Sequence, residues 1–165
     1  MVDPLSELPS ADDFEALLLR EELRRARTGE SLTVAMLDVD GLRRVNAKHG
    51  AAAGSEILRL CASTLRSTLR AVDELARSGP DEFSVLLHAT DSRNASVWAD
   101  RFEDELQALS FELDAGPATC SIGIADTSTD ITLMEAAIRA HRRMKVVQTV
   151  RKLRRDRGGD ALGPA

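Results

Sequence analysis

The run Thr33-Val-Ala-Met-Leu-Asp-Val-Asp40 constrains the fold of this chain more than any other segment. It is short, almost continuously apolar, and ends in two acids, Asp38 and Asp40. A short apolar run of this kind is typical of a strand buried on both faces of a sheet. We therefore expect a central strand here, with two carboxylates at its C-terminal end.

Helical and extended patterns follow one another around this run. Apolar spacing predicts helices at about 11–28, 41–49, 54–70, 92–109 and 133–153, and strands at 74–78, 83–88 and 118–125. The turn Gly79-Pro80-Asp81-Glu82 joins two of the strands into a hairpin. This order predicts a mixed α/β (α+β) fold in which sequential helices pack on one sheet.

Length and composition indicate one globular domain in 165 residues, which we place at 1–153 with a basic and then flexible tail at 154–165. A net charge of -5 and 3% aromatic residues disfavour nucleic-acid binding. No apolar run approaches the ~18 residues of a membrane span. Cys61 and Cys120 lie in separate apolar segments, so no disulfide framework is predicted and a cytoplasmic location is expected. The basic run 151–157 is expected to be a solvated helix end.

Several motifs, in the right order and at the right separations, resemble the GGDEF family of diguanylate cyclases. The main ones are Asp38-Val-Asp40, Arg77-Ser-Gly-Pro-Asp-Glu-Phe83 and Ser121-Ile-Gly-Ile-Ala125. Residues 3–9 look like the motif that opens the family's domain, and Val45-Asn46 with Gly50 and Gly54 match a further family stretch in spacing. The resemblance covers almost the whole chain.

The resemblance implies a single GGDEF-type domain with a central, mostly antiparallel sheet flanked by helices, similar to the palm of adenylyl cyclases and polymerases. Active members of the family condense two GTP into cyclic di-GMP, each of two domains presenting one GTP to the other. The reaction needs a divalent metal such as Mg²⁺ to neutralise the triphosphate. Membership of a family does not establish this activity, so the individual site residues decide it.

The resemblance assigns a Mg²⁺ site to Asp38, the carbonyl of Val39 and Asp81. Asp81 is also the signature acid that is proposed to assist deprotonation, so it is the candidate catalytic residue. Carboxylate oxygens are the ligands that hard divalent cations prefer. Without the family, acids at a strand end would be interpreted as ordinary solvated residues.

The substrate contacts depart from the family pattern. Asn46 matches the guanine-binding asparagine and Lys145 a phosphate-binding lysine, but the guanine-binding aspartate falls on Ser55 and the phosphate arginine on Thr149. A hydroxyl cannot replace a bidentate carboxylate, and the loss of such a contact costs ~1.5–3 kcal/mol. Pro80 replaces the second signature glycine and removes a backbone N–H donor. These departures predict weak or absent cyclase activity.

The inhibitory site of the family, in contrast, is matched in full. Arg70-Ala-Val-Asp73 is an R-x-x-D at the position where the family binds its product, and Arg101 falls on a second arginine of that site. Arginine can bind phosphate or the guanine O6/N7 edge, and aspartate can accept from guanine N–H groups. Without the family, the pair would be a surface salt bridge worth ~0–1 kcal/mol.

We interpret the chain as a cyclic di-GMP-binding regulatory or receptor domain, a degenerate diguanylate cyclase with little or no GTP-condensing activity. Two alternatives stay open: an active, product-inhibited diguanylate cyclase that uses Asp38 and Asp81, and a protein-interaction module that binds no nucleotide. The expected partners are cyclic di-GMP, a second copy of the chain in a homodimer, and a protein effector, without nucleic acid or a membrane span.

Overall fold

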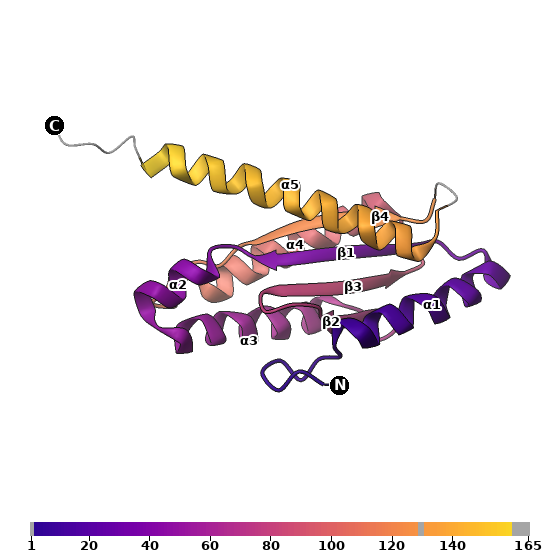
Figure 1. Cartoon of the computed structure of the whole chain (residues 1–165), viewed down its shortest axis with the longest axis horizontal. Helices are drawn as coiled ribbons and strands as arrows, with labels where there is room; N and C mark the ends of the chain where they lie inside the picture. The colour runs from indigo at the N-terminus through magenta and orange to yellow at the C-terminus, as the bar shows by residue number, and fades with distance from the viewer. Residues whose placement is uncertain (1, 129–130, 160–165) are drawn as a thin grey trace.

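The structure is a computed structural model, and it describes residues 2–128 and 131–159 (Figure 1). Its elements, in chain order, are α1 Ala11–Thr28, β1 Leu32–Val39, α2 Leu42–His49, α3 Ala51–Thr68, β2 Glu74–Arg77, β3 Glu82–His88, α4 Ser92–Ser110, β4 Cys120–Asp126 and α5 Leu133–Gly159. This arrangement confirms the expected mixed α/β fold. None of the helices in these described ranges is both long and apolar enough to cross a membrane.

The four strands form one antiparallel sheet in the order β2-β3-β1-β4. Strand β1 lies inside the sheet, and Leu37 pairs with Phe83 of β3 on one side and Ile122 of β4 on the other. All of its residues are buried except Met36, which is half-buried. The apolar run at 33–40 therefore forms the interior strand that the sequence predicts.

Helices cover both faces of the sheet (Figure 1). Alternate residues of β1 point to opposite faces. Ala35 and Leu37 join a core built with α3 and α4, whereas Leu32 and Val34 join a second core built with α1 and α5. The first core contains the fully buried Phe102, and burying a side chain of that size contributes ~1.5–3 kcal/mol to stability.

Helix α1 shows how local sequence sets element boundaries. The Ser10 side chain accepts from the backbone N–H of Asp13, and the Asp13 carboxylate accepts from the backbone N–H of Ser10, which is a capping box. At the other end Gly29 adopts a left-handed conformation with a φ of 69°, which favours glycine. The helix accordingly spans the predicted residues 11–28.

Helix α5 packs directly on the backbone of β4. A Cβ added at Gly123 would lie 2.0 Å from the carbonyl oxygen of Ala140 and 2.3 Å from the backbone nitrogen of Met144. Only glycine allows this approach. Helix α5 thus lies on the sheet, and its last turns extend past the ends of the strands (Figure 1).

Two predicted helix boundaries were wrong. Helix α3 begins at Ala51, not at residue 54, because Gly50 makes a sharp turn with a φ of 87° between α2 and α3. Helix α5 continues to Gly159, so the basic run is helical and the expected tail at 154–165 begins inside a helix. No glycine or proline lies between 133 and 157 to end the helix earlier. Residues 160–165 of the expected tail lie outside the described residues.

Candidate nucleotide-binding sites

The sheet topology brings the three proposed metal ligands to one end of the sheet. Asp38 lies near the C-terminal end of β1 and pairs in register with Glu82 of β3. The backbone N–H of Val39 donates to the carbonyl of Asp81 at 2.9 Å. The end of β1 and the turn of the β2–β3 hairpin are therefore directly adjacent. We call this region, formed by Asp38, Val39, Asp81 and Glu82, the strand mouth.

The Asp38 carboxylate is buried and already bound by two side chains of α5. Its Oδ1 accepts from Gln148 Nε2 at 2.7 Å, and its Oδ2 accepts from Lys145 Nζ at 3.3 Å. Burial and the nearby negative charge of Asp81 raise the pKa of Asp38 to about 6, although Lys145 acts in the opposite direction. A cation at the strand mouth would relieve this repulsion.

Lys145 bridges two carboxylates. Besides Asp38 it donates to Glu82 Oε1 at 2.6 Å. Burial alone would lower the pKa of Lys145, but the hydrogen bond and charge of Glu82, together with Asp38, raise it. Lys145 is therefore held as a cation inside the strand mouth, at a position where the family resemblance assigns it to phosphate.

The donor set of the strand mouth suits a hard divalent cation. Two carboxylates and a carbonyl supply oxygen ligands of the kind that Mg²⁺ prefers. Within residues 2–128 and 131–159 no group of three or more His, Cys, Asp or Glu side chains is arranged to hold a metal ion. The Asp38–Asp81 pair would therefore share the ion with water or phosphate, after Lys145 and Gln148 turned away from Asp38.

Asp40, the second acid at the end of the apolar run, has other partners than Asp38. Its carboxylate accepts from Thr119 at 2.8 Å, from Ser121 at 2.6 Å and from Arg151 Nη1 at 2.9 Å. Arg151 also makes a bidentate pair with Glu103 at 2.7 and 3.0 Å, and these contacts raise its pKa.

Arg151 was missed at the sequence level because it belongs to the basic run that we interpreted as a solvated helix end. For this residue the interpretation was wrong. Its guanidinium joins α5 to α4, to the end of β1 and to the carbonyl of Cys120 on β4. Nothing in its neighbours along the chain signals such a role, because its partners lie 31 to 111 residues away.

The expected guanine contacts lie where α2 meets α3. A Cβ at Gly54 would lie 1.9 Å from Asn46 Oδ1, so the absence of a side chain at Gly54 lets Asn46 lie against α3. Ser55 is the next residue of α3 and is half-buried. Thr149, which stands at the arginine position of the family, donates its hydroxyl to the carbonyl of Lys145 in its own helix at 2.9 Å.

The signature turn forms a hairpin despite Pro80. The backbone N–H groups of Ser78 and Gly79 both donate to the carbonyl of Glu82, at 2.9 and 3.2 Å. Arg77 donates from Nη2 to the carbonyl of Pro80 at 2.6 Å, and its Nη1 donates to both carboxylate oxygens of Asp3, at 2.8 and 2.9 Å. The turn is thus pinned to the N-terminal segment.

The R-x-x-D motif forms a corner between α3 and β2. Asp73 Oδ2 accepts from the backbone N–H and the Nε of Arg70, at 2.9 and 3.1 Å. Its Oδ1 accepts from Arg70 Nη2 and from the backbone N–H of His88, both at 3.0 Å. The Asp73 side chain is 2% exposed and the Arg70 side chain 55% exposed. Asp73 is therefore a buried anchor that presents Arg70 at the surface.

Arg101 reaches the same helix end from α4. Its Nη2 donates to the carbonyl of Thr68, the last residue of α3, at 3.3 Å. Trp98, one turn earlier on α4, donates from Nε1 to the Thr68 hydroxyl at 3.3 Å. Arg70 follows Thr68 by two residues, so both arginines flank the end of α3, which we call the arginine corner. Their role as ligands of cyclic di-GMP stays a prediction.

Comparison with known families agrees with this architecture. The model of a family described as diguanylate cyclase, GGDEF domain, matches residues 1–152. The chain belongs to the GGDEF family. The GGDEF domain is 37% identical over 126 residues to the diguanylate cyclase DgcP of Pseudomonas aeruginosa, which covers 75% of this chain and 19% of DgcP. It spans about a fifth of that relative's length.

Solved GGDEF domains have the same fold. The GGDEF domain of TpbB from Pseudomonas aeruginosa superposes with a TM-score of 0.82 at 30% identity, covering 90% of this chain and 89% of the other. The diguanylate cyclase SiaD of Pseudomonas aeruginosa, solved with its activator SiaC, gives a TM-score of 0.81 at 29% identity, covering 90% and 58%. The GGDEF domain of DgcB from Caulobacter crescentus, solved with c-di-GMP, gives 0.82 at 21% identity over 90% of each chain, a likeness of fold.

Proposed function

We propose that this GGDEF domain is a cyclic di-GMP-binding regulatory domain with little or no diguanylate cyclase activity. The observation that carries the proposal is the arginine corner, where Arg70 is held by the buried Asp73 and Arg101 reaches the same helix end. Two guanidinium groups on one exposed surface suit a ligand that has two phosphodiesters and two guanines. The DgcB domain solved with c-di-GMP shows that the fold can carry such a ligand.

The three residues of the corner have different parts in this proposal. Arg70 and Arg101 would contact phosphate oxygens or the guanine O6/N7 edge. The oxygens of Asp73 already accept four hydrogen bonds from Arg70 and His88. Asp73 would therefore accept from guanine only by releasing contacts to Arg70, and its first role is to position that arginine.

The strand mouth supports the loss of cyclase activity. Asp38, the Val39 carbonyl and Asp81 would hold Mg²⁺, which would supply charge neutralisation of the GTP triphosphate. Lys145 and Gln148 occupy the carboxylate of Asp38. Together with Ser55, Thr149 and Pro80 in place of the family's residues, these contacts leave GTP weakly held.

A second candidate function is an active, product-inhibited diguanylate cyclase. The retained Asp38 and Asp81 at one strand mouth favour it, and relatives such as DgcP are diguanylate cyclases. We further propose a cytoplasmic location, because Cys61 and Cys120 are free, buried thiols. A second copy of the domain and a protein effector are the proposed protein partners, by analogy with SiaD, which was solved with its activator SiaC.

Calorimetric titration with cyclic di-GMP tests the proposal. We expect saturable binding that Arg70→Ala and Arg101→Ala each weaken by ~1.5–3 kcal/mol, about ten- to a hundredfold, because each removes charged hydrogen bonds. Arg157→Ala is the matched control, since Arg157 begins another R-x-x-D outside the corner. Emission from Trp98, the single tryptophan, gives a second readout through Thr68. Equal binding by all variants, or no binding, contradicts the proposal.

A further inference from the structure

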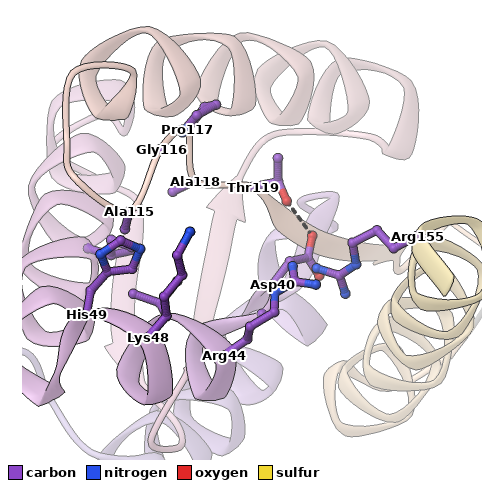
Figure 2. A pocket seen from close by; sticks show the side chains of 13 residues that line it. Asp40, Arg44, Lys48, His49, Ala115, Gly116, Pro117, Ala118, Thr119 and Arg155 are labelled. Atoms are coloured by element: carbon purple, nitrogen blue, oxygen red, sulfur yellow. Dashed lines mark hydrogen bonds between the residues drawn. The ribbon is translucent and has the colours of Figure 1, made fainter. Parts of the chain in front are cut away.

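A pocket of about 400 Å³ runs along α2, between this helix, residues 115–119 and the last turns of α5 (Figure 2). Its lining includes neither Asp38 and Lys145 of the strand mouth nor Arg70 and Arg101 of the arginine corner. We call it the α2 pocket. Its volume is in the range of small-molecule sites.

Three permanent cations converge on this pocket. Arg44 and Lys48 lie four residues apart, on one face of α2, and Arg155 reaches in from α5 (Figure 2). A Cβ added at Gly41 would lie 3.1 Å from Arg155 Nη1 and 3.3 Å from Arg44 Nη2, so the two guanidinium groups face the same small space. Like charges repel at this range unless an anion lies between them.

Nothing else in the pocket neutralises these charges. The one carboxylate in its lining is Asp40, whose oxygens already accept from Thr119, Ser121 and Arg151. The side chains of Arg44 and Arg155 make no hydrogen bond or ion pair with any residue in the ranges 2–128 and 131–159. The two guanidinium groups therefore keep their donors free for an external ligand.

The remaining wall of the pocket is apolar. Val45 and Ile57 line it from the helices, and Ala115 and Ala118 line it from the segment before β4. Gly116 adopts a φ of 75° in that segment, and His49 of α2 also lines the pocket (Figure 2). Such a surface can bind the apolar part of a ligand, and the volume of the pocket exceeds that of a phosphate ion.

We propose that the α2 pocket binds a small organic phosphate, separately from cyclic di-GMP. The phosphate group lies between Arg44 and Arg155, with Lys48 adding charge, and the uncharged part of the ligand lies on the apolar wall. A phosphate monoester carries more negative charge than a carboxylate and has three terminal oxygens, so it can accept from both guanidinium groups and from Lys48 at once, which favours a phosphate over a carboxylate here.

Phenyl phosphate is a suitable probe because it combines a phosphate with a compact apolar body. Titrated into the full chain by calorimetry and by the amide NMR signal of Gly116, it should bind saturably and more tightly than inorganic phosphate or benzoate. Arg44→Gln and Arg155→Gln should each weaken it at least about fivefold, the scale of one charged hydrogen bond at a solvated site. Arg43→Gln on α2 and Arg157→Gln on α5 are matched controls, because neither lines the pocket.

Further variants distinguish the α2 pocket from the strand mouth and from the arginine corner. Arg70→Ala and Lys145→Gln should leave phenyl phosphate binding unchanged, and Arg44→Gln should leave cyclic di-GMP binding unchanged. Three results overturn the proposal: no saturable binding up to about 50 mM, which marks an affinity too weak for a built site; equal weakening by the control variants; or loss of binding in Arg70→Ala or Lys145→Gln. Lys145 is half-exposed and the other substituted positions are exposed, so folding can be checked by the unchanged melting temperature.

Discussion

At the scale of single residues, the pKa and the structural role of an aspartate depend on the hydrogen bonds that it accepts and not on its charge alone. Asp38, Asp73 and Asp126 all lie near strand ends or corners, yet their surroundings differ. Asp38 is buried beside another acid and its pKa is raised. Asp73 is buried and accepts four hydrogen bonds, two of them from backbone N–H groups. Asp126 accepts from two serines, which lowers its pKa.

The R-x-x-D pair should separate a structural effect from a binding effect. Asp73→Ala leaves the backbone N–H groups of Arg70 and His88 without their acceptor. It also removes the ion pair of Arg70, which keeps only the His88 carbonyl and the Thr90 hydroxyl as acceptors, so we expect a loss of about 2–4 kcal/mol in the free energy of unfolding. Arg70→Ala leaves Asp73 with two backbone donors and should cost about 1–2 kcal/mol. Urea unfolding measures both. Equal stability of Asp73→Ala and the unmodified domain would contradict the anchoring role.

The lowered pKa of Asp126 should make the free energy of unfolding depend on pH. Burial would raise its pKa, but hydrogen bonds from Ser128 and Ser92 outweigh burial and lower the pKa from 3.8 to about 2. A lowered pKa in the folded state stabilises the domain above the unfolded value of 3.8, and this gain is lost as the pH falls toward 2. Asp126→Asn should therefore cost about 1 kcal/mol at pH 7 and nearly nothing near pH 2.

Urea titrations between pH 2 and pH 7 test this difference. Asp104→Asn is the control, because within the described part of the chain the Asp104 side chain accepts no hydrogen bond and is exposed. Asp104→Asn removes an exposed carboxylate without removing a hydrogen bond, so its cost in stability should be smaller than that of Asp126→Asn at pH 7. A cost of Asp126→Asn that stays constant down to pH 2 would rule out the linkage.

At the scale of elements, α5 is the helix that contacts both the strand mouth and the separate cluster around Asp40. It packs on β4 at Gly123, reaches Asp38 through Lys145 and Gln148, and reaches Asp40 and Glu103 through Arg151. Its last turns extend beyond the sheet (Figure 1). Within the described part of the chain, no side chain from 152 to 157 makes a hydrogen bond or an ion pair. The ion pairs of Arg151 are therefore the final strong attachment of this helix.

Removing that attachment should loosen the end of α5. Arg151→Ala leaves Asp40 and Glu103 without their cation, so amide hydrogen exchange at residues 152–157 should speed up, by about tenfold for a loss of ~1.4 kcal/mol in local stability. The first half of α5, from Leu133 to Met144, should keep its protection. Arg157→Ala is the matched control on the same helix. Unchanged exchange in Arg151→Ala would show that the helix end is held by other contacts.

At the scale of the whole molecule, the strand mouth and the arginine corner lie at opposite ends of the sheet. Asp38 pairs with Glu82 at the mouth, and Leu32 pairs with His88, whose carbonyl accepts from Arg70 at the corner. Six residues of an extended strand separate these pairs by about 20 Å. A ligand at the corner therefore cannot contact the mouth of the same chain, and any inhibition through it would act between chains or through the sheet.

GTP turnover by the intact domain should be negligible with Mg²⁺ present. Pro80→Gly alone should not restore it, because Ser55 and Thr149 still provide no carboxylate for guanine and no guanidinium for phosphate. Chromatographic detection of cyclic di-GMP measures both proteins, with cyclic di-GMP binding as the control for folding. Robust product formation by the unmodified domain would favour the active cyclase.

The sequence by itself determined the features that depend on near neighbours. Apolar spacing predicted α1, a continuous apolar run predicted β1, the turn predicted the hairpin, and ordered motifs indicated the family. These signals are local because helical spacing, apolar runs and tight turns involve residues only a few positions apart. Only the tertiary structure decided that Gln148 and Lys145 fill the Asp38 carboxylate and that Arg151 binds Asp40, across 107 to 111 residues. Such pairs depend on how α5 packs over the sheet, which no local pattern encodes.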